Sequence, residues 1–535
     1  MPKSSIKNKF FILLPFILGA LFLFSNLSNH SLWEDEAETA VLAKSVMHHG
    51  IPKAFDGQNL LYLHIKDSYR SGSTWTFHPW LQCYITALSF YTLGISTFSA
   101  RFPFALIGFF TLILFYFLTL KLFNTRSIAL LSTWLLVFSI YFILHMRQCR
   151  YYAPTVFFTL SFLFSYLHFI EQKKYALLYF ILSANFLFHS NYGAFIPVMG
   201  AIILHYFIFH HSKKDILKKF LLALLAIFLL IFPWFIYLKG YQHRGVLDFH
   251  HISHQVQFYF RAIYKYMIPL LFFALVSLAQ ILYRKKSNIL SFWKQFSKEN
   301  TWLLLLVILV TLVFSIIGDQ RYFRYILHLL PLFLILEALL FHEWFKQSLY
   351  VSRISFALIL LTNILHYSAP TYLMKTLPSR IQTHLAALYP PGKLEDQLRN
   401  TFFSPPYQYL YELTHTYKDP LEGIISFLLK NVAAGETVGT PYTHRSLIFY
   451  TPFKIIHLRF EKEVLADWII FQKEWFEDIY GSCETSAYCK KISTTYQKFV
   501  LNYPDILWNN MPEPTYHKFK TVTDAPNLII YKKQR

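Results

Sequence analysis

A short acidic run holds the side chains of this sequence best suited to proton chemistry. Glu34, Asp35, Glu36 and Glu38 place four carboxylates within five residues, directly after an apolar segment. Like charges this close repel one another and raise each other's pKa values, so the run is unfavourable unless a reaction or a cation uses it. Residues 37–49 have helical spacing, and a helix dipole favours carboxylates at its N-terminus. Proton-transfer chemistry and a plain helix cap are both open interpretations of the run.

Arginine and tyrosine recur together at the ends of two other apolar segments. Arginine binds phosphate through paired hydrogen bonds. A carboxylate facing the same cavity as such arginines would suit a phosphate-linked substrate attacked by a deprotonated acceptor. The alternative is that these side chains reach out of the membrane to lipid headgroups. The candidate substrate-binding residues of this kind are Arg147, Arg150, Tyr151, Arg321, Tyr322 and Arg324.

Histidines form a third group of candidates. His78 and His189 lie at predicted helix ends, and Tyr192 follows His189 closely. All three are further candidates for substrate binding. The alternative is a structural role, which is the usual one for a single histidine at such a position. His243, His250, His251 and His254 crowd one loop, but Asp248 does not share the face of the His250–His254 pair, which disfavours a metal site. We predict no metal ligand and no cofactor, with a divalent cation as the less favoured alternative.

The elements that must position these residues are membrane helices. The chain has 535 residues, of which 55% are hydrophobic and 15% charged, whereas soluble domains carry about 25% charged residues. Apolar runs near 20 residues recur from Phe10 to Tyr367, and each is long enough to cross a ~30 Å hydrocarbon core. The net charge of +21 lies largely in short connectors, where it orients helices and meets membrane lipid. None of the usual nucleic-acid-binding motifs is present, so we expect no nucleic-acid partner.

The distribution of basic residues among the loops predicts about 11 transmembrane helices, with 13 as the upper count. Loops rich in lysine and arginine are expected on the cytoplasmic side. All the basic loops lie on that side if the segment 79–95 does not cross the membrane fully. The N-terminus is then cytoplasmic and the first helix is uncleaved. The loop 28–102 and everything after about 370 are extracytoplasmic. The predicted spans are 9–27, 103–121, 127–145, 152–170, 175–188, 190–209, 217–238, 266–283, 302–317, 325–342 and 354–369.

From residue 371 the sequence becomes a mixture of polar and apolar residues. Residues 371–535 are therefore predicted to form a small extracytoplasmic α/β domain, separate from a transmembrane domain over 1–370. Residues 422–430 read as an amphipathic helix, and 436–440, 447–450, 467–471 and 528–531 as short strands. Cys483 and Cys489 are six residues apart, and outside the cytoplasm a disulfide is expected to join them. The alternative is two unpaired thiols.

The order of these features resembles the GT-C membrane glycosyltransferases, especially their protein O-mannosyltransferase and aminoarabinose (lipid A) transferase branch. An acidic Asp35-Glu36 pair follows the first helix, and Ala37-x-x-Ala40 leads to a helix end near Gly50. The resemblance is best over about 30–200 and looser at Arg321-Tyr322 and Pro331. The remaining matching motifs are His78-Pro79-Trp80-Leu81, Leu93-Gly94-Ile95, Ala100-Arg101-Phe102-Pro103 and Lys121-Leu-Phe123.

The resemblance implies a GT-C-like helix bundle with a catalytic first extracytoplasmic loop. The donor would be a polyprenyl-phosphate sugar and the acceptor a lipid, glycan or protein. Asp35 matches the catalytic acidic position and would act as general base, with Glu36 in support. Attack at the anomeric carbon would invert its configuration and release polyprenyl phosphate, whose charge the arginines would stabilise. A bacterial inner (plasma) membrane is the expected location, with cell-envelope glycosylation as the process.

Two departures from the family pattern qualify this interpretation. Several relatives carry a second acidic residue near the position of Cys149-Arg150, where this chain is basic, which favours a metal-free mechanism with Arg147 or Arg150 on the phosphate. His78-Pro79 replaces a common double proline, so His78 is expected to face the cavity. The rival functions are a flippase or transporter for a lipid-linked substrate, which should show internal repeats, and a catalytically inactive assembly subunit.

Overall fold

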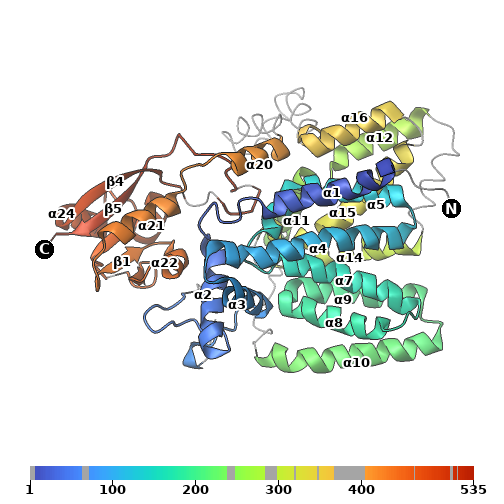
Figure 1. The fold of residues 1–535 in the computed structure, drawn as a ribbon, viewed down its shortest axis with the longest axis horizontal. Coiled ribbons are helices and arrows are strands. Elements are labelled where there is room, and N and C mark those ends of the chain that lie inside the picture. The colour runs from blue at the N-terminus through green and yellow to red at the C-terminus, as the bar shows by residue number, and fades with distance from the viewer. Residues whose placement is uncertain are drawn as a thin grey trace. The chain divides into compact units, whose positions relative to one another are not determined.

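The computed structural model describes residues 6–62, 71–237, 248–283, 298–318, 321–345, 349–366, 404–462, 464–506, 510–514 and 516–534, and Figure 1 shows their helices and strands. Contacts divide the chain into two compact units. The first comprises Met1–Leu23, Leu106–Met146 and Tyr152–Leu410, and the second comprises Phe24–Ala105, Arg147–Tyr151 and Tyr411–Arg535. The acidic run and the C-terminal region therefore belong to one unit. The domain boundary predicted near 370 lies outside the described residues.

Apolar helices make up most of the first unit. Within the described residues, six segments are long and apolar enough to cross a membrane, or up to seven if one bent pair is a single span. A mostly helical architecture with several membrane spans is thus confirmed, while the count of about 11 stays a prediction. Up to residue 366, the described helices are α1 (Ile6–Phe24), α2 (Glu34–His49), η1 (Ser71–Ser73), α3 (Leu81–Leu93), α4 (Thr97–Phe123), α5 (Arg126–Phe138), α6 (Ile140–Met146), α7 (Tyr152–Ile170), α8 (Ala176–Ser190), α9 (Tyr192–Phe209), α10 (Lys214–Tyr237), α11 (Phe249–Tyr266), α12 (Leu270–Tyr283), α14 (Glu299–Ile316), η3 (Phe323–Tyr325), η4 (Leu327–Leu329), α15 (Leu330–Phe345) and α16 (Leu349–Leu361).

Two predicted segments differ in shape from an ordinary span. The segment 127–145, predicted as one continuous helix, is two helices, α5 and α6, bent by 70° at their junction. The break lies at Ser139, whose ψ of 88° leaves the helical region. The helix α3 (Leu81–Leu93) occupies the ambiguous segment 79–95 and has 13 residues, which gives a length of about 20 Å. Because this is shorter than a ~30 Å hydrocarbon core, α3 agrees with an element that does not cross fully.

The membrane helices differ in how much apolar surface they bury. Only 22% of the apolar window of α10 is buried inside the protein, and side chains such as Leu222 and Leu229 are more than half exposed. Water would disfavour this surface, whereas lipid would not. In α15, by contrast, Glu337 is fully buried and neither of its carboxylate oxygens has a hydrogen-bond partner within the described residues. It lines a cavity of about 50 Å³ together with Asn363 and His366.

A five-stranded mixed sheet with helices confirms the small C-terminal α/β region. The strand order is β2-β1-β3-β5-β4, with β1 parallel to β2 and β3, and β5 antiparallel to β3 and β4. Its elements, orange to red in Figure 1, are α20 (Pro405–Thr414), α21 (Pro420–Asn431), β1 (Thr437–Thr440), α22 (His444–Tyr450), β2 (Lys454–His457), β3 (Trp468–Phe471), α23 (Lys473–Tyr480), α24 (Ala487–Thr495), β4 (Tyr496–Pro504) and β5 (Asn527–Lys533).

The predicted strand at 447–450 is wrong, because these residues belong to the helix α22. A short apolar run is equally compatible with a buried strand and a buried helix. Here the helix is favoured by its N-terminus, where the N–H groups of Arg445 and Ser446 donate to the carboxylate of Glu34. The predicted helix at 422–430 and the strands near 437, 468 and 528 are confirmed, and β2 and β4 are additional.

Candidate active site

The acidic run forms the first turn of α2 (Glu34–His49). Trp33 precedes it in extended conformation, and Gly50 ends it with φ at 72°, a left-handed conformation that glycine adopts without strain. The four carboxylates differ in exposure. The side chains of Glu34, Glu36 and Glu38 are 5%, 0% and 1% exposed, whereas that of Asp35 is 19% exposed. Asp35 is therefore the carboxylate of the run that solvent or a ligand reaches.

Glu36 is held by a buried ion pair. Arg101 donates from Nε and Nη2 to the two carboxylate oxygens of Glu36, at 2.8 and 2.6 Å. The same guanidinium donates to the carbonyls of the segment before α2, including that of His30 at 2.8 Å. The backbone N–H of Cys149 adds a bond of 2.9 Å to Glu36. Glu36 is therefore occupied by contacts that fix the first turn of α2.

The segment 147–151 is attached to the start of α2 at three successive positions. The indole Nε1 of Trp33 donates to Gln148, the N–H of Cys149 donates to Glu36, and Nη1 of Arg150 donates to Glu38 Oε1 at 2.7 Å. Two bonds from Nη1 of the same arginine to the carbonyl of Asp35 and the hydroxyl of Thr39 complete the contact. The basic segment thus lies directly against the acidic run.

Arg150 connects the acidic run to His78. Its Nη2 lies 2.9 Å from Nε2 of His78 and 4.0 Å from Oδ2 of Asp35. The Tyr151 ring lies 5.4 Å from the guanidinium carbon. His78, Arg150, Tyr151 and Asp35 therefore gather at one place. Arg147 is directed elsewhere, with Nη2 donating to the carbonyl of Ser25 at 2.6 Å.

An arginine of the C-terminal region completes the site. Nη1 of Arg445 lies 3.0 Å from Oε2 of Glu38 and 3.5 Å from Oδ1 of Asp35. Arg445 is held at the N-terminus of α22, where Glu34 accepts hydrogen bonds from Ser446 and lies 3.3 Å from Nδ1 of His444. The packing of α22 against α2 thus carries a second guanidinium to Asp35.

The charges of the site nearly balance. Glu34, Asp35, Glu36 and Glu38 meet Arg101, Arg150 and Arg445 through the contacts above. Repulsion between the four carboxylates, which the sequence alone leaves unexplained, is thus offset by arginines from three distant segments. Burial nevertheless raises the pKa of Glu34 to about 7, although Arg445 and the hydrogen bonds from Ser446 act in the opposite direction.

Five predicted substrate-binding residues belong to the first unit. His189 and Tyr192 flank the junction of α8 and α9, with His189 against the ring of Trp234 and Tyr192 against Phe188. The Arg324 guanidinium carbon lies 3.9 Å from the Tyr322 ring centre, and Arg321 is exposed. These contacts fit membrane-interface residues and leave their role as substrate ligands a prediction.

Sequence reasoning missed two of the three arginines. Arg101 lies inside the matched Ala100-Arg101-Phe102-Pro103 motif, and its position at the start of an apolar helix was the available signal. Arg445 carries no comparable signal, because it is an isolated basic residue in a mixed segment and reaches the acidic run only through the docking of α22.

Comparisons with known proteins bear on this geometry. Residues 77–237 match the family model described as Dolichyl-phosphate-mannose-protein mannosyltransferase. The structure of ArnT from Cupriavidus metallidurans bound to undecaprenyl phosphate superposes with a TM-score of 0.57 at 10% identity, covering 98% of both chains. The chain has the GT-C fold. The Archaeoglobus fulgidus oligosaccharyltransferase agrees, with a TM-score of 0.50 at 12% identity over 95% of this chain and 76% of that one.

The resemblance to GT-C membrane glycosyltransferases is therefore confirmed. An uncharacterized protein of Aquifex aeolicus (strain VF5) is 29% identical over 160 residues, which is 30% of this chain. The match spans only 32% of that relative's length. At 10% and 12% identity, the likeness to these structures establishes the fold alone.

Proposed function

We propose that the protein is an integral membrane glycosyltransferase that moves a sugar from a polyprenyl-phosphate donor to an extracytoplasmic lipid, glycan or protein acceptor. The observation that carries this proposal is the environment of Asp35. It is the one partly exposed carboxylate of the acidic run and has a guanidinium on each side, Arg150 at 4.0 Å and Arg445 at 3.5 Å. A base beside two phosphate-binding groups suits transfer from a phosphate-linked sugar.

The reaction follows from these groups. The acceptor hydroxyl gives its proton to the Asp35 carboxylate while its oxygen bonds to the anomeric carbon. The bond from that carbon to the phosphate oxygen breaks on the opposite face, so configuration inverts. The electron pair leaves with polyprenyl phosphate, whose charge Arg150 and Arg445 stabilise. His78, 2.9 Å from Arg150, helps to hold that guanidinium.

The membrane arrangement is part of the proposal. The N-terminus would be cytoplasmic, and the acidic run and the C-terminal α/β region extracytoplasmic, in a bacterial inner membrane and with envelope glycosylation as the process. The grouping of 24–105, 147–151 and 411–535 in one compact unit supports a common side for these segments. The undecaprenyl phosphate in the ArnT structure supports a polyprenyl-phosphate donor.

The test compares the wild type with Asp35→Asn in reconstituted membranes, using radiolabelled polyprenyl-phosphate sugars and a cell-envelope extract. Asp56→Asn is the matched control, because Asp56 is an exposed aspartate of the same loop that accepts hydrogen bonds from the Gln58 and Asn59 N–H groups. We expect transfer by the wild type and by Asp56→Asn, and none by a folded Asp35→Asn protein. Equal transfer by all three would overturn the assignment of Asp35. Absence of transfer with every donor would favour the flippase or the inactive subunit.

A further inference from the structure

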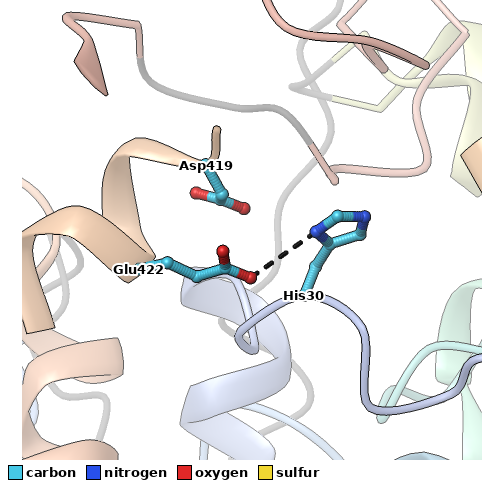
Figure 2. A group of neighbouring side chains, drawn as sticks. All are labelled: His30, Asp419 and Glu422. Atoms are coloured by element: carbon cyan, nitrogen blue, oxygen red, sulfur yellow. Dashed lines mark ion pairs between the residues drawn. The ribbon is translucent and has the colours of Figure 1, made fainter. Parts of the chain in front are cut away.

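A second cluster of metal-ligating side chains lies outside the acidic run. His30, Asp419 and Glu422 each offer one ligand atom, and these atoms all lie within 4.8 Å of one another (Figure 2). His30 belongs to the segment between α1 and α2. Asp419 is the N-cap of α21, and Glu422 lies in its first turn. Two segments far apart in the sequence thus bring an imidazole and two carboxylates together within one compact unit.

The imidazole of His30 is directed into this cluster without a hydrogen bond to it. His30 is 6% exposed, and its Nδ1 has no hydrogen-bond partner within the described residues. The nearest carboxylate oxygen, Glu422 Oε1, lies 3.6 Å away, which is too long for a hydrogen bond (Figure 2). A buried ring nitrogen without a partner is unfavourable, so this nitrogen indicates a ligand between the side chains.

The separations suit ligands of one ion. Two ligands at about 2.1 Å from a tetrahedral zinc ion are about 3.4 Å apart, close to the 3.6 Å between Nδ1 of His30 and Glu422. The Glu422 side chain is 38% exposed and has room to rotate. Asp419 is 3% exposed, so its carboxylate is held close to that of Glu422 inside the protein. A cation would relieve the cost of holding these carboxylates together.

Polar side chains also face the other ring nitrogen of His30. Glu412 Oε1 lies 4.0 Å from Nε2 of His30, and Glu412 Oε2 lies 2.8 Å from Nε2 of His517. The Asn29 side-chain amide nitrogen lies 3.5 Å from the same ring nitrogen. Both groups lie on the Nε2 side of the ring and leave Nδ1 as the nitrogen that faces Glu422. Metal-bound histidines commonly have such a carboxylate behind the ring.

We propose that His30, Asp419 and Glu422 form a binding site for a divalent transition-metal cation, with Zn²⁺ as the fitting ion for a mixed imidazole and carboxylate set. The cation links the segment before α2 to the start of α21. Because His30 precedes the first acidic residue of α2 by four positions, the link holds the helix that carries Asp35. The site is structural and does not depend on the transferase proposal.

The test measures Zn²⁺ binding to the full chain in detergent, purified with a tag free of histidine and stripped with a chelator. Calorimetry and elemental analysis give affinity and stoichiometry, and thermal unfolding gives the stabilisation. We expect a bound Zn²⁺ that raises the unfolding temperature. The exposed His250–His254 pair, with ring nitrogens 3.3 Å apart, is a competing surface site, so the His250→Ala/His254→Ala variant is the reference protein for every measurement.

In that reference background, Glu422→Gln and His30→Gln should each weaken Zn²⁺ binding by more than about tenfold, the smallest loss typical even of outer partners of a metal site. Glu422 is partly exposed, so Glu422→Gln decides the question if His30→Gln does not fold. Unchanged Zn²⁺ affinity in both variants overturns the proposal. It is equally overturned if the reference protein binds no Zn²⁺, or if only Ca²⁺ stabilises it, because Ca²⁺ prefers oxygen ligands.

Discussion

Nη1 of Arg445 lies between two carboxylates of α2, 3.5 Å from Oδ1 of Asp35 and 3.0 Å from Oε2 of Glu38. This contact joins the C-terminal region to the acidic run, so the α/β region is part of the candidate active site.

The first prediction concerns this guanidinium. Arg445→Ala should leave the buried Glu38 carboxylate with less compensation, and removing one partner of a buried pair typically costs about 3–5 kcal/mol. We expect a lower unfolding temperature and loss of transfer. Arg445→Lys keeps the charge but not the paired geometry, so it should recover much of the stability and little of the activity. Thermal unfolding and transfer assays of the same preparations check this.

Arg459→Ala is the control for Arg445. Arg459 is also in the C-terminal region, but its ion pair with Asp478 is between side chains that are 27% and 59% exposed. Pairs of this kind contribute at most about 1 kcal/mol. A drop in activity as large in Arg459→Ala as in Arg445→Ala would mean that the C-terminal region, and not the Arg445 contact, is what transfer requires.

The second prediction separates the structural carboxylate from the reacting one. Glu36→Gln should destabilise the protein strongly, because Arg101 is 6% exposed and would lose its charged partner. The exposed pair Lys121–Glu171 gives the comparison, and Glu171→Gln should change stability by no more than about 1 kcal/mol. Thermal unfolding measures both. A normally stable Glu36→Gln protein without activity would instead make Glu36 a catalytic residue.

The third prediction is a pH dependence that Glu34 causes. Burial raises its pKa from 4.5 to about 7. At a pH between these two values, the folded protein therefore keeps a proton on Glu34 that the unfolded chain has released. Stability must therefore fall as pH rises through this window. Glu34 faces Arg445 and His444 at 3.9 and 3.3 Å, and neither removes the effect of burial.

Unfolding temperatures between about pH 5 and pH 8 check this pH dependence. Glu34→Gln should reduce the decrease, since glutamine does not titrate, whereas Glu484→Gln, at an exposed position, should leave it unchanged. A decrease that persists in full in Glu34→Gln would assign it to another group.

Local patterns in the sequence account for much of this fold. The helical spacing after Asp35 predicts α2, and the amphipathic pattern of 422–430 predicts α21, because each depends on neighbours in the chain. The run 447–450 is a case in which the local pattern does not determine the secondary structure. Its apolar residues suit a strand or a helix equally well, and the contact of Glu34 with the N-terminus of α22 decides between them.

The site is less predictable than the elements that form it. Asp35 and Arg150 stand out because acidic and basic residues cluster at the ends of apolar segments. The partners Arg101 and Arg445 are isolated in sequence and meet α2 only in the folded chain. The His30 cluster has the same origin, since Asp419 and Glu422 resemble an ordinary helix start until His30 is placed beside them.

The last prediction concerns the bond between Cys483 and Cys489, which the structure contains. It closes the loop between α23 and α24, beside the buried Phe476 and Ile492. By restricting the unfolded chain, a disulfide that closes so short a loop stabilises the folded protein by about 2 kcal/mol. The Cys483→Ser/Cys489→Ser variant should therefore unfold at a lower temperature.

Thiol alkylation after unfolding checks the bond directly, because Cys83 and Cys149 are free. Without reductant we expect two of the four cysteines to react, and with reductant all four. Reaction of all four without reductant would show that the bond is absent from the purified protein.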